Sequence, residues 1–171
     1  MFYEFILSLK DIEQIAVCTM AASGRRAMDI RRIKSEGVLQ SDGKWFVTLD
    51  KDKQNSLPVN FMFEYKDNIF KEVNSLDQRF QNELDRKSEP FENVDWQKLR
   101  RMAPFRLHSL RNRRAIKLIL AGYEVHEVQM ALAWADMKSL QRYLKLSPDA
   151  IRCLNDYEKV LKISGRKQNE K

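Results

Sequence analysis

The sequence predicts a mainly α-helical domain with one small antiparallel β-sheet. Apolar residues recur at helical spacing over most of the 171 residues, whereas two neighbouring segments have the aromatic and β-branched pattern of strands. Hydrophobic residues make up 43% and charged residues 32% of the chain, a composition typical of a globular domain with a hydrophobic core. The expected fold class is therefore α+β, with helices before and after the sheet.

The chain before the sheet predicts two helices. Residues 10–22 place apolar side chains at helical spacing, and Ser23 and Gly24 then interrupt the pattern. A second helix is expected over 25–34, before a turn at Gly37.

The sheet is expected to be a hairpin. Residues 44–49, KWFVTL, are rich in strand-forming side chains, and residues 58–65 alternate apolar and polar side chains after an opening proline. The polar segment 50–56 lies between them and predicts the connecting turn.

The rest of the chain predicts helices. Residues 66–86 are charged and helical in pattern, and in the loop that follows Asn93 or Asp95 can cap the next helix, which Pro104 ends. Further helices are expected over 107–121, 125–133, 136–145 and 148–163. We expect one domain over 1–163 and a polar tail over 164–171.

The charge balance favours an acidic partner. The net charge is +7 and the isoelectric point is near 9.4, which favours nucleic acid first and an anionic membrane surface second. A basic protein without such a partner remains an alternative at this point. Cys18 and Cys153 form no metal-ligand pattern, which indicates reduced thiols inside a cell. No apolar run is long enough to span a bilayer, so no segment embedded in a membrane is expected.

Two turns in the first half of the chain carry cationic side chains. Arg25 and Arg26 follow the Ser-Gly turn, and Asp29 lies one helical turn after Arg26. An arginine at a helix start can present its planar guanidinium to a phosphate, and a carboxylate one turn later can orient it. Lys51 and Lys53 lie in the hairpin turn, from which a lysine can reach a cleft. Taken alone, each segment is more typical of a solvated surface, and the lysine turn strongly so.

A third segment places a histidine beside several arginines. His108 and Arg111 fall on one face of a helix, and Arg113 and Arg114 continue the positive charge. A histidine can exchange a proton near neutral pH, and an arginine beside it can neutralise an anion. A single helical histidine is more often structural, but the neighbouring charges favour contact with a phosphate.

The spacing of these residues completes a pattern. Trp134 follows Arg111 by 23 residues, and Tyr143 follows Trp134 by nine. With Arg26 and His108, this order and spacing resembles the catalytic domain of the tyrosine recombinase, or phage integrase, family. The resemblance covers about residues 10–147.

The individual motifs also resemble those of the family. Residues 23–29 match Thr-Gly-x-Arg-x-x-Glu with conservative changes, which makes Arg26 the first catalytic arginine. Residues 108–111 match His-x-Leu-Arg. Trp134 stands at the second histidine position, where the family also uses tryptophan, and Tyr143 stands at the nucleophile position.

The sequence departs from the family pattern at three positions. Asp29 replaces a glutamate, Ala133 replaces the usual glycine, and Trp134 replaces the commoner histidine. A tryptophan can donate one N–H but cannot shuttle a proton. The family's catalytic lysine corresponds to Lys51 or Lys53, and Lys51 is preferred because the family often has a second polar residue after the catalytic one.

The resemblance implies transesterification of a DNA phosphodiester. Tyr143 would attack phosphorus and form a 3′-phosphotyrosine, with His108 accepting or relaying its proton. Arg26 and Arg111 would stabilise charge on the phosphate in the transition state, and Lys51 would protonate the leaving 5′-oxygen. The reaction needs no metal ion and no cofactor, because cationic side chains carry the charge.

The resemblance further implies double-stranded DNA as the partner and a tetramer assembled on it. Arg25, Lys53, Arg113 and Arg114 are the expected backbone contacts, and the protein is expected inside the cell, associated with DNA. The chain begins just before the first catalytic helix of the family, so we expect an excised catalytic domain or a minimal member without the separate N-terminal DNA-binding domain.

Several functions share this pattern. The first is a site-specific recombinase or integrase, as in a virus or mobile element. The second is a type IB topoisomerase or hairpin-telomere resolvase with the same chemistry. The third is a DNA-binding descendant of the fold without catalysis, which the presence of all four motif residues, Arg26, His108, Arg111 and Tyr143, disfavours.

Overall fold

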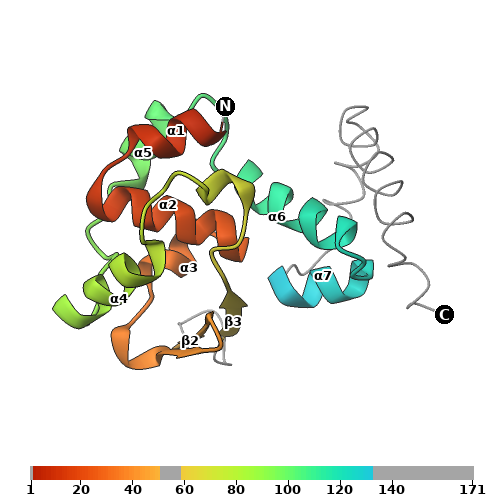
Figure 1. The fold of residues 1–171 in the computed structure, drawn as a ribbon, viewed down its shortest axis with the longest axis horizontal. Helices are drawn as coiled ribbons and strands as arrows, with labels where there is room; N and C mark the ends of the chain where they lie inside the picture. Colours follow the sequence, from red (N-terminus) through yellow and green to blue (C-terminus); the bar gives the residue numbers. More distant parts are fainter. Residues whose placement is uncertain (1, 51–58, 133–171) are drawn as a thin grey trace. The chain divides into compact units, whose positions relative to one another are not determined.

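The computed structural model describes residues 2–50 and 59–132, which form the coloured ribbon in Figure 1. The chain divides into two compact units, Met1–Arg111 and Asn112–Lys171, with the boundary inside one helix. The first unit holds the helices α1 (Phe2–Ser8), α2 (Asp11–Ser23), α3 (Ala27–Arg31), α4 (Leu76–Arg86) and α5 (Trp96–Met102). Helix α6 (Ser109–Leu120) crosses the boundary, and α7 (Val125–Leu132) lies in the second unit.

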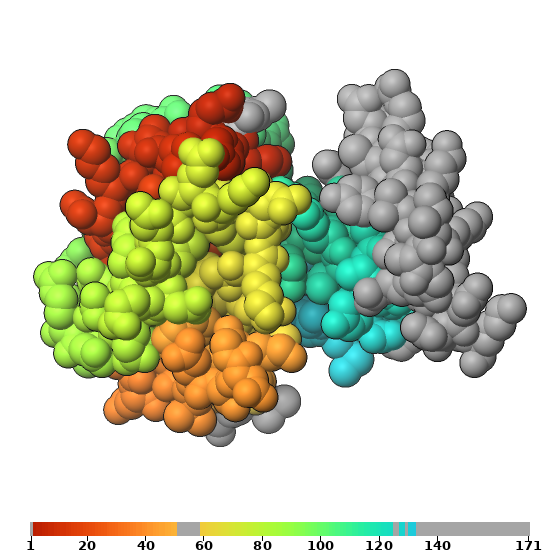
Figure 2. Space-filling model, in the orientation of Figure 1, coloured from red at the N-terminus to blue at the C-terminus, as the bar shows by residue number. Residues whose placement is uncertain are grey.

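Helix α2 is the centre of the first unit. It contacts α1, α3, α4 and the third strand (Figure 1), and every residue from Gln14 to Ser23 is buried. Small and apolar side chains on all sides of the helix permit this burial. The segments that follow the sheet, in yellow and yellow-green, cover the middle of the face shown in Figure 2. The C-terminal end of α2 is therefore buried in the core, and Arg25 and Arg26 follow it closely in the sequence.

The sheet has three antiparallel strands in the order β1 (Val38–Ser41), β2 (Lys44–Leu49) and β3 (Val59–Phe63). Asp42 and Gly43, both with positive φ, join β1 to β2, as in a tight two-residue hairpin turn. Side chains of β2 alternate strictly between solvent and core. Strand β1 was missed from the sequence because most of its residues are exposed, so it lacks that alternation.

An aromatic cluster joins the sheet to the helices. Phe80 of α4 lies 4.7 Å from Trp45, 5.5 Å from Phe63 and 5.8 Å from Phe91, measured between ring centroids. The Trp45 indole N–H donates to Asp77 Oδ1 at 2.7 Å, so its polar atom is satisfied. This cluster fixes β2 and β3 beneath the helices.

Other elements differ from the sequence prediction in their limits. Helix α1 was not predicted, because its segment is short and mostly apolar. The helix expected over 25–34 is limited to five residues in α3. The helix expected from 66 starts at Leu76, because Ser75 has a left-handed backbone (φ 53°) and the preceding residues form turns. Asp95 caps α5, as one of the two predicted candidates: its Oδ1 accepts from the Lys98 N–H at 3.0 Å.

The second unit is described as far as Leu132. Its small core consists of Ala115 from α6 with Val128 and Leu132 from α7, and Leu118 and Ile119 pack against it. Gly122 lies two residues beyond the end of α6 and has φ 98°, a conformation that suits a glycine after a helix end. The helices expected over 136–145 and 148–163 lie outside the described residues, so the prediction of one domain over 1–163 with a tail over 164–171 stays a prediction. In the described ranges, no helix has the length and hydrophobicity required to cross a membrane.

Candidate active site

Two consecutive arginines follow the end of helix α2. Gly24 adopts the left-handed conformation (φ 70°), and its N–H donates to the Met20 carbonyl, which ends the helix. The Arg25 N–H then donates to Ser23 Oγ at 3.2 Å, and Arg26 is the N-cap residue of α3. The Ser-Gly turn predicted from the sequence is confirmed, and it directs two neighbouring arginines to different surroundings.

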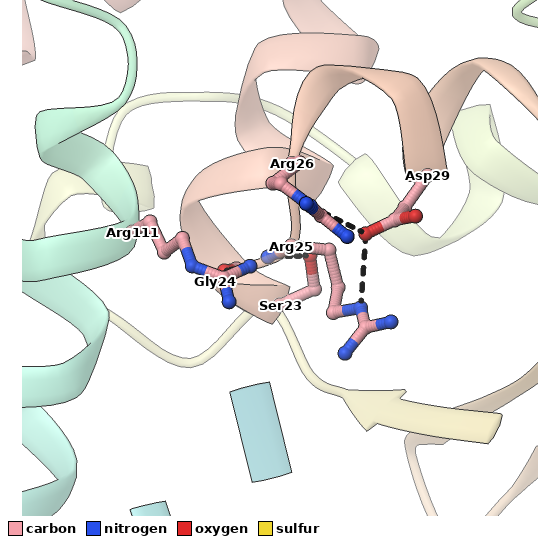
Figure 3. A network of polar contacts seen from close by, with 6 residues as sticks. All are labelled: Ser23, Gly24, Arg25, Arg26, Asp29 and Arg111. Carbon is pink, nitrogen blue, oxygen red and sulfur yellow. Dashed lines mark hydrogen bonds and ion pairs between the residues drawn. The ribbon is translucent and has the colours of Figure 1, made fainter. Parts of the chain in front are cut away.

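Asp29 lies between these two arginines (Figure 3). Its Oδ2 atom is 3.4 Å from Arg25 Nε and 3.9 Å from Arg26 Nε. The Arg25 side chain is 2% exposed and the Arg26 side chain 58% exposed. Asp29 therefore pairs more closely with the buried arginine than with Arg26, the residue that the sequence pattern assigned to it.

Arg111 approaches the same turn from helix α6. Its side chain is buried, and Nη1 donates to the Gly24 carbonyl at 3.5 Å, across 87 residues of sequence. Burial, with the nearby charges of Arg25 and Arg26, lowers the pKa of Arg111 to about 9, while Asp29 opposes the shift. Arg111 thus remains charged at neutral pH, in surroundings that favour the arrival of an anion. We call Arg25, Arg26, Asp29 and Arg111 the arginine cluster.

His108 lies at the exposed edge of the arginine cluster. Its carbonyl accepts the Arg111 N–H at 3.1 Å, and its side chain is exposed. Partial burial lowers the pKa of His108, and the positive charges of Arg111 and Arg26 lower it further. The neutral imidazole is therefore favoured at pH 7, which is the form that can accept a proton.

The His108 pKa gives a first test of this arrangement. We expect the His108 imidazole to titrate below 6.5 and to titrate at higher pH in Arg111→Met, because a nearby cation is then lost. The chain has two histidines, so His126 serves as an internal reference in an NMR titration. An unchanged His108 pKa in the variant would contradict the proximity of the two side chains.

The other predicted site residues divide into two groups. Arg113 and Arg114 lie on α6 and are half-buried. The others, Lys51, Lys53, Trp134 and Tyr143, lie outside the described residues. Their predicted roles stay predictions.

The end of strand β2, just before the lysine-bearing turn, is anchored by charged side chains. Lys34 Nζ lies 2.9 Å from Asp50 Oδ2, and Arg32 donates to the Asp50 carbonyl. The hydrogen bond and charge of Lys34 lower the pKa of the Asp50 carboxyl. Sequence reasoning missed this anchor, because its partners are separated by more than a dozen residues and each is an ordinary surface residue.

Sequence reasoning also missed two groups that contact the arginines. The Gly24 carbonyl accepts from Arg111, and the Phe61 ring lies 5.1 Å from Arg25 Cζ. The alternation of β3 indicates that Phe61 points inward, but it does not say which side chain meets it. Within residues 2–50 and 59–132, no group of three or more His, Cys, Asp or Glu side chains is placed to hold a metal ion.

Comparison with known proteins gives a likeness of fold. No protein-family model matches the sequence. No curated protein matches it at a significant level. Among solved structures, the XerA recombinase is similar with a TM-score of 0.64 and 16% identity over 92% of this chain and 59% of that chain.

Two complexes of the XerH site-specific recombinase with its difH substrate are also similar. The pre-cleavage complex has a TM-score of 0.61 and 15% identity over 83% of this chain and 47% of that chain. The post-cleavage complex, on a palindromic difH substrate, has a TM-score of 0.62 and 13% identity over 96% of this chain and 50% of that chain. The chain thus spans about half the length of these recombinases. The predicted fold class is confirmed: mainly helical with a small antiparallel sheet, in the catalytic-domain fold of these proteins.

Proposed function

We propose that this chain is the catalytic domain of a site-specific DNA recombinase or integrase. It cleaves and rejoins DNA strands through a 3′-phosphotyrosine, without a metal ion or cofactor, as a DNA-associated protein inside the cell. The observation that carries the proposal is the approach of Arg111 to the turn that bears Arg26, with His108 three residues before Arg111, in the fold of recombinases. These residues come from two motifs far apart in the sequence, so their proximity is a property of the fold.

The arginine cluster suits a phosphodiester. Three guanidinium groups accompany a single carboxylate, so the cluster keeps an excess of positive charge in largely buried surroundings. Charges act more strongly where water is excluded, and preorganised donors are typically worth about 3–4 kcal/mol each in a transition state. Arg26 and Arg111 are the proposed ligands of the non-bridging oxygens.

The proposed reaction exchanges one phosphate ester for another. Tyr143 Oη bonds to phosphorus while the bond from phosphorus to the 5′-oxygen breaks. The phenol proton passes to His108, and Lys51 supplies a proton to the leaving 5′-oxygen, with Trp134 donating its N–H to the phosphate. The phosphotyrosine retains the bond energy of the cleaved phosphodiester. Attack by a 5′-hydroxyl in the reverse direction therefore rejoins the DNA without ATP.

Covalent capture tests the proposal without a known target site. The protein is incubated, with EDTA present, with a pool of nicked duplexes of random sequence around the nick. Cleavage near a nick releases a short 5′-hydroxyl fragment, which traps the adduct for gel separation and sequencing. An enriched sequence in the trapped DNA is expected. Relaxation of supercoiled DNA with no sequence preference would favour a topoisomerase, and DNA binding without any adduct would favour the non-catalytic alternative.

Binding to duplex DNA should depend strongly on salt. Neutralising each phosphate releases counterions, so the logarithm of affinity falls linearly with the logarithm of salt concentration. The net charge of +7 and the expected contacts Lys53, Arg113 and Arg114 motivate this prediction. Fluorescence anisotropy between about 50 and 200 mM salt measures it, and we expect a loss of at least about 10-fold. Constant affinity over that range would contradict a DNA-backbone interface.

The proposal includes self-association to a tetramer on DNA. The apolar stripe expected over residues 148–163 motivates it. Light scattering with and without duplex DNA tests it: we expect larger particles when DNA is present, and a monomer bound to each duplex would count against assembly.

A further inference from the structure

Arg25 occupies an interior position that rarely suits an arginine. Its side chain is 2% exposed, it lies against Phe61, and its Nε and Nη1 atoms are buried without a hydrogen-bond partner. Burial lowers the pKa of Arg25, and Asp29 opposes the shift. Replacing a buried ion pair with apolar residues of similar size is often neutral or stabilising. Stability of the core therefore does not account for Arg25.

The arrangement of charges around Asp29 gives Arg25 another role. Asp29 is itself buried, and its Oδ2 atom is the oxygen nearest to both arginines. Arg25 is the closer partner and is shielded from water, whereas Arg26 is farther away and largely exposed. An ion pair away from water is screened less, so the Arg25 pair dominates.

A second partner for Asp29 matters when Arg26 engages a phosphate. An Arg26 guanidinium that turns toward the anion gives up attraction to Asp29, from which its Nε already lies 3.9 Å away. A buried carboxylate left without a partner costs about 3–5 kcal/mol. With Arg25 in place, the carboxylate keeps a counterion throughout, and this cost does not oppose the movement of Arg26.

We propose that Arg25 is a positioning residue, the permanent counterion of Asp29, which keeps Arg26 available for the phosphate. The role rests on the proposed function of the cluster. In Figure 3 the Arg25 guanidinium is directed to Asp29, and we therefore do not assign it to the phosphate. The prediction of Arg25 as a contact to the DNA backbone is replaced by this proposal, because its buried side chain is paired with Asp29 and lies against Phe61.

Exchange of the arginine Nε–H protons tests the arrangement without DNA. In the unmodified protein we expect slow exchange at Arg25 and fast exchange at Arg26, measured by ¹⁵N NMR. In Arg25→Met, Asp29 turns to Arg26, and Arg26 exchange should slow about 10-fold, in line with coupling energies between contacting residues. Arg25→Lys keeps the buried charge and should leave Arg26 exchange fast. If the Nε–H proton of Arg26 exchanges at the same rate in Arg25→Met as in the unmodified protein, the proposal is overturned.

A double variant shows whether the slower Arg26 exchange in Arg25→Met acts through Asp29, and if Arg25→Met does not fold, fast exchange at Arg25 in the unmodified protein would still overturn the proposal. Arg25→Met/Asp29→Asn removes both buried charges, so the core stays neutral. Without the carboxylate, nothing in the cluster retains Arg26, and its exchange should be as fast as in the unmodified protein. Slow Arg26 exchange in the double variant would show that another group holds Arg26, which is incompatible with the proposal.

Adduct formation then separates positioning from a purely structural role. At a temperature where all variants are folded, Arg25→Met should form adduct about 10-fold more slowly with nearly unchanged DNA affinity, and the double variant should recover much of the rate. A folded Arg25→Met that reacts at the original rate would overturn the positioning role. If the unmodified protein forms no adduct, the proposed function fails, whereas the exchange measurements still decide how Asp29 is partnered.

Discussion

Replacing Arg111 with methionine is expected to slow formation of the covalent DNA adduct about 100- to 1,000-fold, the usual effect of removing one preorganised donor from a transition state. DNA affinity should fall far less, because the contact strengthens as charge develops on the phosphate. Arg111 is buried beside Arg25 and Arg26, so methionine fills similar space and removes a costly buried charge. Single-turnover rates and binding isotherms on one duplex measure the two effects.

Arg100→Met is the matched control. Arg100 is an exposed arginine in the last turn of α5, outside the arginine cluster, so its loss removes the same charge from the surface. We expect a small change in affinity and almost none in rate. Equal losses of rate and affinity in Arg111→Met would make Arg111 a simple phosphate anchor.

Replacing Tyr143 with phenylalanine is expected to abolish the adduct and leave DNA binding nearly intact. The substitution removes one oxygen, the proposed nucleophile, and keeps the ring. Tyr123→Phe is the matched control, because Tyr123 is 48% exposed and lacks the motif spacing. Persistent adduct in Tyr143→Phe, or its loss in Tyr123→Phe, would place the nucleophile elsewhere.

The local parts of the site were predictable from the sequence. The Ser-Gly end of α2 follows from the interruption of a helical pattern, and the proximity of His108 to Arg111 follows from their spacing. The family pattern predicted that the two motifs lie together, and the hydrogen bond from Arg111 to the Gly24 carbonyl joins them.

The long-range parts of the site were not predictable in this way. An arginine in a polar segment is normally solvated, and nothing in that segment indicates that Arg25 is buried and lies against Phe61 on a distant strand. Arg25 also lies closer to Asp29 than Arg26 does, so the carboxylate pairs mainly with Arg25 and not with the arginine that the sequence pattern assigned to it. Strand β1 and the late start of α4 depend likewise on exposure and on the left-handed backbone of Ser75, neither of which has a clear periodic signal.

Identifying the protein residue and the DNA end that are joined in the covalent adduct tests the central claim most directly. After covalent capture, digestion with trypsin and nuclease followed by mass spectrometry identifies the modified residue and the end of DNA attached to it. We predict a 3′-phosphate ester on Tyr143 and a free 5′-hydroxyl on the released strand. A 5′-phosphate linkage, attachment to another residue, or no adduct on any duplex of the pool would contradict the account.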